Sequence, residues 1–374
     1  MNNFKKRKRL IFVSIVFVYL IFLFLNELTI KKSMLVAPLT NLTGPSLKYI
    51  LYWTPFFDRK DFCIGFGSEP FKSCEYKNCF STDNRFLIPE ELFDAILFHA
   101  TYSKLEHGTP RKRRKQQKYI FMNLESPLHT TDLKQYNSFY NWTMTYRSDS
   151  DVFRPYSYIL QNETDYVLPS VDSVMKRDKL VAWFVSNCNS KSGRENFTRE
   201  LQEYLPVDIY GDCGQYKCAK QVTDYKQSSE ECYEMIENNY LFYLSLENSL
   251  CKDYVTEKMY NVLKRNIVPV VYGGANYTQI APPYSVINVN DFDSVKDLAN
   301  YLIYLSKNIN EYMKYFEWKR NYYVETSNQL SSCELCRKLN VDQSDKVYVD
   351  LNAWWWGPEK RYCKKPPLTF YKEH

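Results

Sequence analysis

Short apolar runs that each end in polar residues recur along the chain after residue 47. The first three runs are LKYILYW (47–53), AILFHA (95–100) and YIFMNLE (119–125). Their length and apolar character are typical of strands buried in a parallel sheet. Parallel sheets bind ligands at the carboxyl ends of their strands, which is where the polar residues of these runs stand. The pattern therefore predicts an α/β layer structure with a ligand-binding edge.

A second series of the same kind follows a charged segment at residues 171–179. Its predicted strands are KLVAWFVSN (179–187), VDIYG (207–211), NNYLFYLSLEN (238–248) and IVPVVYGG (267–274). Helices are predicted over residues 192–205, 257–266, 291–308 and 310–323. A chain of 374 residues is too long for one ordinary core. We therefore predict an α/β fold with two Rossmann-like doubly wound lobes that face a cleft, at residues 48–175 and 176–325.

The N-terminus carries a membrane signal. Five basic residues at 5–9 precede an apolar run from Leu10 to Leu25, and no small-residue cleavage site follows it. We predict a cytosolic tail at 1–9, a transmembrane signal anchor at 10–30 and a stem at 31–47, with the remaining chain in the lumen. The alternative is a nuclear localisation signal, which the contiguous apolar run disfavours. We expect no nucleic-acid partner, and the net charge of +6 is modest for this length.

Cysteines and sequons agree with a lumenal body. All 11 cysteines lie beyond the predicted span, as expected where disulfides form. The sequons predict N-glycosylation at Asn41, Asn141, Asn162, Asn196 and Asn276. These features predict a single-pass type II membrane protein of the secretory pathway.

The Cys/Trp-rich tail at residues 326–374 contains Cys333-Glu-Leu-Cys336 and three successive tryptophans, Trp354–Trp356. A CxxC can be a zinc half-site, a redox pair or part of a disulfide framework. The second half-site that zinc requires is missing from the sequence, so structural disulfides are favoured. At least one tryptophan is expected to pack on the body or to line a groove.

Two predicted helix starts in the second lobe carry cations. Thr256 stands at an expected N-cap and is followed by Glu257 and Lys258, while Arg194 lies in the first turn of the helix after residue 192. A lysine is unfavourable at the positive end of a helix dipole unless an anion lies beside it. Together the two sites fit a nucleoside diphosphate, although a solvated lysine is the simpler interpretation of Lys258 alone.

The segment LENSLCKDYVTEK, followed by IVPVVYGGANYTQIAPPYSVINVNDF, resembles the donor-binding signature of the α1,3-fucosyltransferases, glycosyltransferase family 10. Further similar strings occur in the same order, namely DAILFHA (94–100), NLESP (123–127), FYNWTMTYRSDSD (139–151) and VAWFVSNCN (181–189). The resemblance runs from about Lys48 to Tyr323. It implies a GT-B fold with an acceptor-binding lobe at 48–175 and a GDP-fucose-binding lobe at 176–325.

The resemblance also implies roles for individual residues. Arg194 and Lys258 match cations that face the donor diphosphate, and Glu257 matches a carboxylate that contacts the ribose or the fucose. Glu125 in NLESP matches the proposed general base of an inverting transfer. The other residues of the implied donor site are Glu247, Asn248, Tyr254 and Thr256.

The implied reaction moves L-fucose from GDP-β-L-fucose to the 3-hydroxyl of a GlcNAc in glycoprotein glycans, in the membrane of a Golgi cisterna. The tail resembles the invertebrate and plant enzymes that act on the N-glycan core, whereas Lewis-type transfer to peripheral lactosamine uses the same donor motifs. Other hypotheses are a non-catalytic, membrane-tethered glycan-binding relative and a transferase of another nucleotide sugar. No cofactor is expected to be required, although Mn²⁺ can stimulate such an enzyme.

Two further patterns have competing interpretations. Asp149-Ser150-Asp151 is a DxD, which holds a divalent cation in other glycosyltransferases, but it falls in the predicted acceptor lobe and we expect no metal site. The basic run Arg111–Lys115 can be a nuclear signal, a proprotein convertase site or a solvated loop, and the loop is favoured.

Overall fold

The computed structural model describes residues 46–100, 107–163, 166–218 and 229–367. Within these ranges no helix is both long and apolar enough to cross a membrane. The predicted cytosolic tail and anchor, nearly all of the predicted stem, and Asn41 lie outside the described residues.

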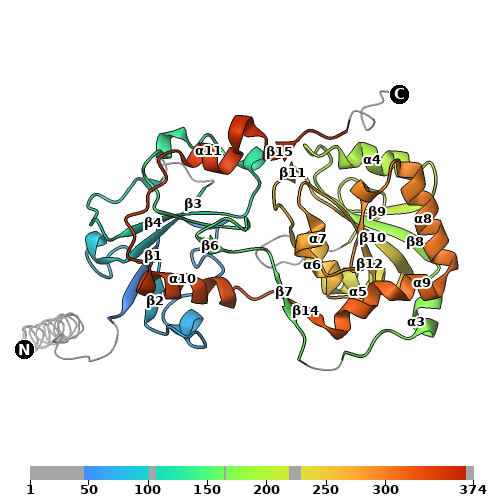
Figure 1. The fold of residues 1–374 in the computed structure, drawn as a ribbon, viewed down its shortest axis with the longest axis horizontal. Coiled ribbons are helices and arrows are strands. Elements are labelled where there is room, and N and C mark those ends of the chain that lie inside the picture. The colour runs from blue at the N-terminus through green and yellow to red at the C-terminus, as the bar shows by residue number, and fades with distance from the viewer. Residues whose placement is uncertain (1–45, 101–106, 164–165, 219–228, 368–374) are drawn as a thin grey trace, which may run out of the picture. The chain divides into compact units, whose positions relative to one another are not determined.

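A parallel sheet of six described strands forms the first lobe, in the order β2-β1-β3-β4-β5-β6 (Figure 1). These strands are β1 (Lys48–Tyr52), β2 (Cys79–Thr82), β3 (Ala95–His99), β4 (Lys118–Asn123), β5 (Trp142–Thr145) and β6 (Val152–Phe153). Short 3₁₀ helices lie between them, at Glu69–Phe71, Glu90–Leu92, Pro127–His129 and Lys134–Tyr136. Every residue of β3 and β4 is buried, as the continuous apolar runs predict.

A second parallel sheet of five described strands forms the other lobe, in the order β13-β12-β10-β8-β9. These strands are β8 (Lys179–Phe184), β9 (Val207–Tyr210), β10 (Tyr240–Leu246), β12 (Val268–Tyr272) and β13 (Ile287–Asn288). The strand order reverses between β8 and β10, because β9 lies on one side of β8 and β10 on the other. Open α/β sheets bind ligands at such a switch point.

Helices cover the second sheet. They are α3 (Val171–Met175), α4 (Arg194–Leu201), α5 (Glu230–Asn239), α6 (Glu257–Leu263), α7 (Tyr277–Ile280), α8 (Val295–Lys307) and α9 (Ile309–Met313), with 3₁₀ helices at Val289–Asp291 and Lys314–Arg320. Leu201 of α4 and Leu298 of α8 share one core with Leu244 of β10 and Val270 of β12. The α/β class and the two parallel sheets are confirmed.

Two of the crossings between the lobes run on neighbouring strands. β7 (Tyr158–Gln161) leads from the first lobe to the second, and β14 (Tyr322–Glu325) pairs antiparallel with it on the return. The predicted helix at 310–323 is therefore wrong at its end. The α-helix α9 stops at Met313, and the last residues extend to pair with β7.

The C-terminal tail completes the first lobe (Figure 1). Leu335 of α10 (Gln329–Val341) packs with Ile50 on one side of the first sheet, and Trp355 of α11 (Leu351–Trp356) packs with Phe121 on the other. Because successive strand residues point to opposite faces, these two cores use alternate residues of the same strands. A further 3₁₀ helix, Pro358–Lys360, precedes the short strand β15 (Cys363–Lys364).

Disulfides attach this tail to both lobes. Cys333 and Cys336 bond to Cys74 and Cys79 respectively, so the CxxC is part of a disulfide framework as favoured from the sequence. Cys363 of β15 bonds to Cys251 of β11 (Leu250–Cys251), which pairs antiparallel with β15. The remaining two of the five bonds, Cys188–Cys213 and Cys218–Cys232, lie within the second lobe.

Candidate active site

A cavity of about 250 Å³ opens at the carboxyl ends of β8 and β10, at the switch point of the second sheet. Its walls combine aromatic rings with charged and amide side chains. They are formed by Phe184, Val185, Ser186, Asn187, Arg194, Tyr210, Gly211, Cys218, Tyr233, Tyr243, Asn248, Glu257 and Lys258. Four of the residues predicted for donor binding, Arg194, Asn248, Glu257 and Lys258, therefore line one cavity.

Glu247 is buried beside the cavity, in contact with the lining residue Lys258. It directly follows β10 and is 1% exposed. Its Oε1 accepts the backbone N–H of Thr256 at 2.7 Å, and the Thr256 hydroxyl donates to Oε2 at 2.9 Å. Burial raises the pKa of Glu247, while Lys258 acts in the opposite direction. The carboxylate fixes the loop that joins β10 to α6.

Lys258 is held by two carboxylates at the start of α6. Its Nζ lies 3.4 Å from Glu247 Oε2 and 3.1 Å from Glu257 Oε1, and it donates to Thr256 Oγ1 at 2.8 Å. Burial lowers the pKa of Lys258, but Glu247 and Glu257 outweigh this and leave it raised. These ion pairs stabilise a lysine at this helix start. Its position therefore does not by itself require a bound anion, as the sequence had suggested.

Arg194 begins α4 and is 3% exposed. Its Nη1 donates to the carbonyl of Leu246 at 2.9 Å, and its Nη2 donates to the carbonyl of Asn187 at 3.0 Å. A guanidinium has two N–H groups on each Nη, so one on each remains for a ligand in the cavity. The preceding Gly193 has φ +70°, and a Cβ there would lie 3.0 Å from Pro366 of the tail. Glycine thus allows the tail to approach the start of α4.

Three of the predicted donor residues, Glu247, Tyr254 and Thr256, do not line the cavity. Thr256 caps α6 and binds Glu247, as described above. Tyr254 is 2% exposed, and its hydroxyl donates to Glu125 Oε2 at 3.4 Å. Tyr254 therefore connects the loop between β10 and α6, in the second lobe, to the Glu125 carboxylate of the first lobe.

Glu125 stands in the loop after β4, two residues beyond the strand rather than at its end. Burial raises the pKa of Glu125, and Lys258 counteracts this rise. Its backbone N–H donates to Asn123 Oδ1 at 3.0 Å. Asn123 Nδ2 in turn donates to Thr130 Oγ1, which also receives the indole N–H of Trp355 at 3.2 Å. The tail tryptophan thus supports the loop that carries Glu125.

A small polar cluster that the sequence did not reveal joins the two lobes beside Glu125. Ser126 Oγ donates to Ser249 Oγ at 2.9 Å, and Ser249 Oγ donates to Asn248 Oδ1 at 3.1 Å. His129 Nδ1 lies 3.1 Å from Ser126 Oγ and 3.3 Å from Ser249 Oγ. Burial and the nearby Lys191, Lys258 and Arg194 lower the pKa of His129, which favours the neutral ring. The sequence offered one sign of this cluster, which is that each serine follows a residue predicted for the site. Ser126 follows Glu125, and Ser249 follows Asn248.

Both aspartates of the DxD are engaged by other side chains. Asp149 pairs with Arg147, and with Lys252 at 3.3 Å. Asp151 accepts from Lys346 Nζ at 2.6 Å and from the Tyr348 hydroxyl at 2.8 Å. Within the described residues no group of three or more His, Cys, Asp or Glu side chains is placed to hold a metal ion. The two aspartates, which stand between β5 and β6, thus bind side chains of the donor segment and of the tail.

The described sequons differ in accessibility. Asn276 is exposed, Asn162 and Asn196 are half-buried, and Asn141 is 7% exposed. Asn141 Nδ2 donates to the carbonyl of Lys346 at 2.9 Å, and a glycan on this nitrogen would displace the tail segment there. The structure therefore disfavours Asn141 as a glycosylation site.

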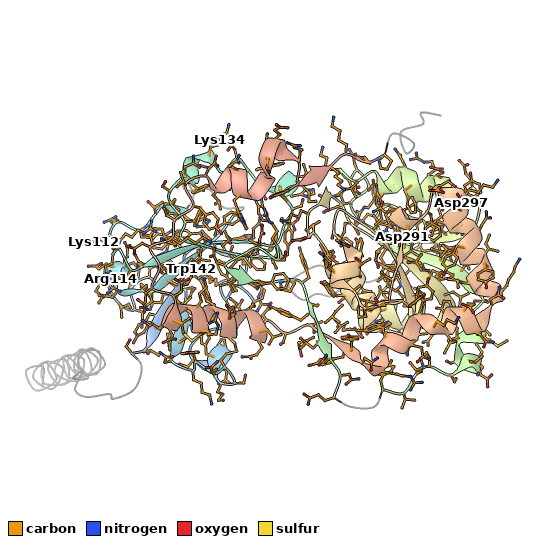
Figure 2. The ribbon with its side chains drawn as sticks, in the orientation of Figure 1. Lys112, Arg114, Lys134, Trp142, Asp291 and Asp297 are labelled. Atoms are coloured by element: carbon orange, nitrogen blue, oxygen red, sulfur yellow. A yellow bond between two sulfur atoms is a disulfide. The ribbon has the colours of Figure 1, made fainter. Side chains whose placement is uncertain are left out.

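The basic run at residues 111–115 is an exposed loop at the outer edge of the first lobe, where Lys112 and Arg114 project outwards (Figure 2). Lys115 pairs with Asp345 at 2.7 Å. The solvated-loop interpretation is confirmed, while convertase cleavage at this loop stays a prediction.

Two parallel α/β lobes, with a cation-lined cavity in one and a buried carboxylate from the other, form the arrangement expected of a glycosyltransferase of the GT-B type. The family model "Fucosyltransferase, N-terminal" matches residues 45–157, and "Glycosyltransferase family 10 (fucosyltransferase) C-term" matches residues 174–354. The chain therefore belongs to the fucosyltransferases of glycosyltransferase family 10, and the resemblance of its sequence to the α1,3-fucosyltransferases is confirmed.

Individual proteins agree with this assignment. Alpha-(1,3)-fucosyltransferase C of Drosophila melanogaster is 37% identical over 342 residues, which cover 83% of this chain and 78% of that protein. Glycoprotein 3-alpha-L-fucosyltransferase A of the same organism is 38% identical over 298 residues, which cover 76% of this chain and 56% of that protein. A crystal structure of an alpha1,3-fucosyltransferase with GDP-fucose has a TM-score of 0.53 at 17% identity, covering 84% of this chain and 96% of that one, and supports the fold.

Proposed function

We propose that this enzyme transfers L-fucose from GDP-β-L-fucose to the 3-hydroxyl of GlcNAc in glycoprotein glycans, with inversion at the anomeric carbon. The observation that carries the proposal is the position of Glu125. It belongs to the first lobe, yet Tyr254 of the second lobe binds it, and Lys258 is close enough to influence its pKa. A base from one lobe therefore stands beside the charged cluster of the other.

In an inverting transfer the acceptor oxygen attacks the face of the sugar opposite the leaving GDP. Glu125 takes the proton of that hydroxyl, which needs a carboxylate with a raised pKa in its ionised form. Burial supplies the raised pKa. The new glycosidic bond forms as the bond between fucose and the β-phosphate oxygen breaks, and the proton ends on Glu125.

The leaving diphosphate carries the negative charge that develops. Arg194 offers one remaining N–H on each Nη, a geometry that suits two phosphate oxygens. Lys258 adds a fixed positive charge at the same cavity. Because both cations are already held by protein groups, little reorganisation is required during departure.

The N-glycan core is the acceptor that we favour. The relative named as a glycoprotein 3-alpha-L-fucosyltransferase, which is 38% identical, supports a glycoprotein acceptor. The decisive experiment incubates the purified lumenal chain with GDP-fucose and two acceptors, an N-glycan with an exposed core and a peripheral lactosamine. Mass spectrometry then locates the fucose.

Fucose on the inner GlcNAc supports the core assignment, and fucose on lactosamine assigns Lewis-type transfer instead. Absence of transfer to both, with GDP binding retained, would identify a non-catalytic glycan-binding relative. Turnover of another nucleotide sugar in place of GDP-fucose would show that the proposed donor is wrong.

We also propose that the enzyme is a type II protein of Golgi cisternae, anchored by residues 10–30, and that it requires no metal. Protease protection and microscopy of the full chain test its topology and location. The engagement of Asp149 and Asp151 by cations and hydroxyls supports metal-independent transfer. Activity that survives EDTA agrees with it, and activity that only Mn²⁺ restores contradicts it.

A further inference from the structure

A second cavity, of about 320 Å³, lies between the lobes and shares no lining residue with the donor cavity. Ser148 and Phe153 of the first lobe form part of its wall, and Asp253 and Tyr260 of the second lobe form another part. The connecting segment contributes Pro155, Ser157, Tyr158 and Ile159. Tyr156, between these residues, instead donates its hydroxyl to the carbonyl of Leu124, beside Glu125. Glu125 itself is not among the residues that line this cavity.

The wall combines aromatic rings with polar groups, as carbohydrate ligands require. A pyranose has an apolar face that packs on aromatic rings and a rim of hydroxyls that needs hydrogen-bonding partners. Tyr158 and Tyr260 supply rings, and Asp253 supplies a carboxylate whose Oδ2 accepts from the Ser148 hydroxyl at 2.8 Å.

Tyr146 supplies a further aromatic ring to the wall of the cavity. It lines the cavity and is 2% exposed, and its ring packs against Tyr254 and Trp355. Within the described part of the chain its hydroxyl has no hydrogen-bonding partner. That hydroxyl is closed off from the cavity as well as from solvent, so a sugar can contact the ring of Tyr146 but not its hydroxyl.

One lining residue can itself carry a carbohydrate. Asn276 is an exposed sequon residue at the cavity, where it caps α7. Its Oδ1 accepts from the backbone N–H of Thr278 at 3.2 Å and from the Thr278 hydroxyl at 2.7 Å. These bonds engage the side-chain oxygen and do not involve Nδ2, which is the atom that N-glycosylation modifies.

We propose that Asn276 carries an N-glycan and that the first sugars of this glycan dock in the cavity between the lobes. A covalent tether gives the sugar an effective concentration on the order of millimolar, so even weak contacts suffice. Because the walls come from both lobes, the docked sugar holds them together at the crossing strands. The inference requires passage through the secretory lumen but does not depend on fucosyl transfer.

The first experiment measures the shielding of the glycan. The secreted protein is treated with a peptide N-glycosidase, native and denatured, and site occupancy is followed by mass spectrometry. A docked sugar should slow native release at Asn276 at least tenfold relative to the denatured chain, whereas other occupied sequons should be released readily. An unglycosylated Asn276, or native release as fast as at the other sites, overturns the proposal.

The second experiment compares one substitution with and without the glycan. Asn276→Asp removes the sequon but retains a good N-cap. In that background Tyr158→Ser truncates one ring of the cavity wall, and the fall in the thermal midpoint measures the cost of that truncation alone. With the glycan present, the same substitution also removes a ring on which the sugar packs, so the midpoint should fall by about 2 °C more. A fall of equal size in both backgrounds contradicts docking.

Transfer activity measured on the same samples keeps the two proposals apart. A protein that transfers fucose but has a bare or unshielded Asn276 disproves only the docking. A shielded glycan on a protein that transfers nothing disproves only the proposed function.

Discussion

The donor side and the base side of the site are held in different ways. Glu247, Lys258 and Arg194 lie at the ends of regular elements, and each has charged or carbonyl partners within its own lobe. Glu125 lies in an irregular loop, and its supports include Tyr254 of the other lobe and, through Thr130, Trp355 of the tail. One side is built locally, and the other is assembled from distant parts of the chain.

This difference separates binding from turnover. Changes on the donor side should remove fixed charges and weaken nucleotide binding. Changes around Glu125 should leave the nucleotide site intact and reduce the rate of transfer. Each variant below is expected to fall on one side of that division.

The largest effect is expected for Glu125→Gln. It removes the base, so kcat should fall by about 10³-fold, within the usual range for general-base catalysis, while the Kd for GDP stays the same. Transfer and calorimetric GDP titration measure the two quantities. Residual activity above a few per cent of wild type would remove Glu125 from this role.

The raised pKa of Glu125 leads to two further predictions, one for the stability of this variant and one for the pH dependence of the wild-type enzyme. A carboxyl whose folded pKa exceeds its unfolded value adds stability below the unfolded pKa, and this is lost as the pH rises through the folded value. Glu125→Gln should therefore be more stable than wild type at pH 7. In wild type, kcat/KM should fall on acidification at a pH above the ordinary glutamate pKa of about 4.3, because the base must be ionised. A less stable Gln variant, or an unshifted acid limb, contradicts the desolvation of Glu125.

The next largest effect is expected for Lys258→Met, which should raise the Kd for GDP by about 100-fold. The substitution also leaves Glu247 buried without its cation, so the free energy of unfolding should fall by about 2 kcal/mol. The double variant Lys258→Met/Glu247→Gln removes both charges and is the matched control. It should recover stability without recovering GDP affinity, and recovery of both would show that Lys258 serves only to neutralise Glu247.

The same division explains what the sequence could predict. Buried strands and the cations at the starts of α4 and α6 follow from local patterns, and the structure places Arg194 and Lys258 at one cavity. α5 was missed, because its buried residues Cys232, Tyr233 and Ile236 are few among acidic ones. Contacts between remote segments have no local signature.

The base loop shows this limit most clearly. Trp355 meets Thr130 across 225 residues, and Cys74 meets Cys333 across 259. A run of three tryptophans predicts burial of some ring but not which ring or where. Only Trp355 of the three is fully buried, because α11 turns the other two rings towards its less buried sides.

A smaller effect is expected for Trp355→Phe, which retains a buried ring but loses the N–H that donates to Thr130. Loss of one hydrogen bond that supports the Glu125 loop should lower kcat by about fivefold to tenfold, with the Kd for GDP unchanged. Trp356→Phe is the matched control, one residue along the same helix. An equal loss of activity in both variants would indicate general damage to α11.

The smallest effect is expected for Ser249→Ala, which breaks the hydrogen bond that Ser126 of the first lobe donates to Ser249 of the second. Ser249 belongs to the donor segment by sequence, yet it accepts from Ser126 beside Glu125. If the cluster serves the base, kcat should fall about threefold and the Kd for GDP should not change. Ser126→Ala should have a similar effect, and the double variant should lose little more than either single variant, because both remove the same contact. Additive losses, or a rise in the Kd for GDP that matches the fall in kcat, would place Ser249 on the donor side. The boundary between binding and turnover would then lie between Ser126 and Ser249 and would coincide with the boundary between the lobes.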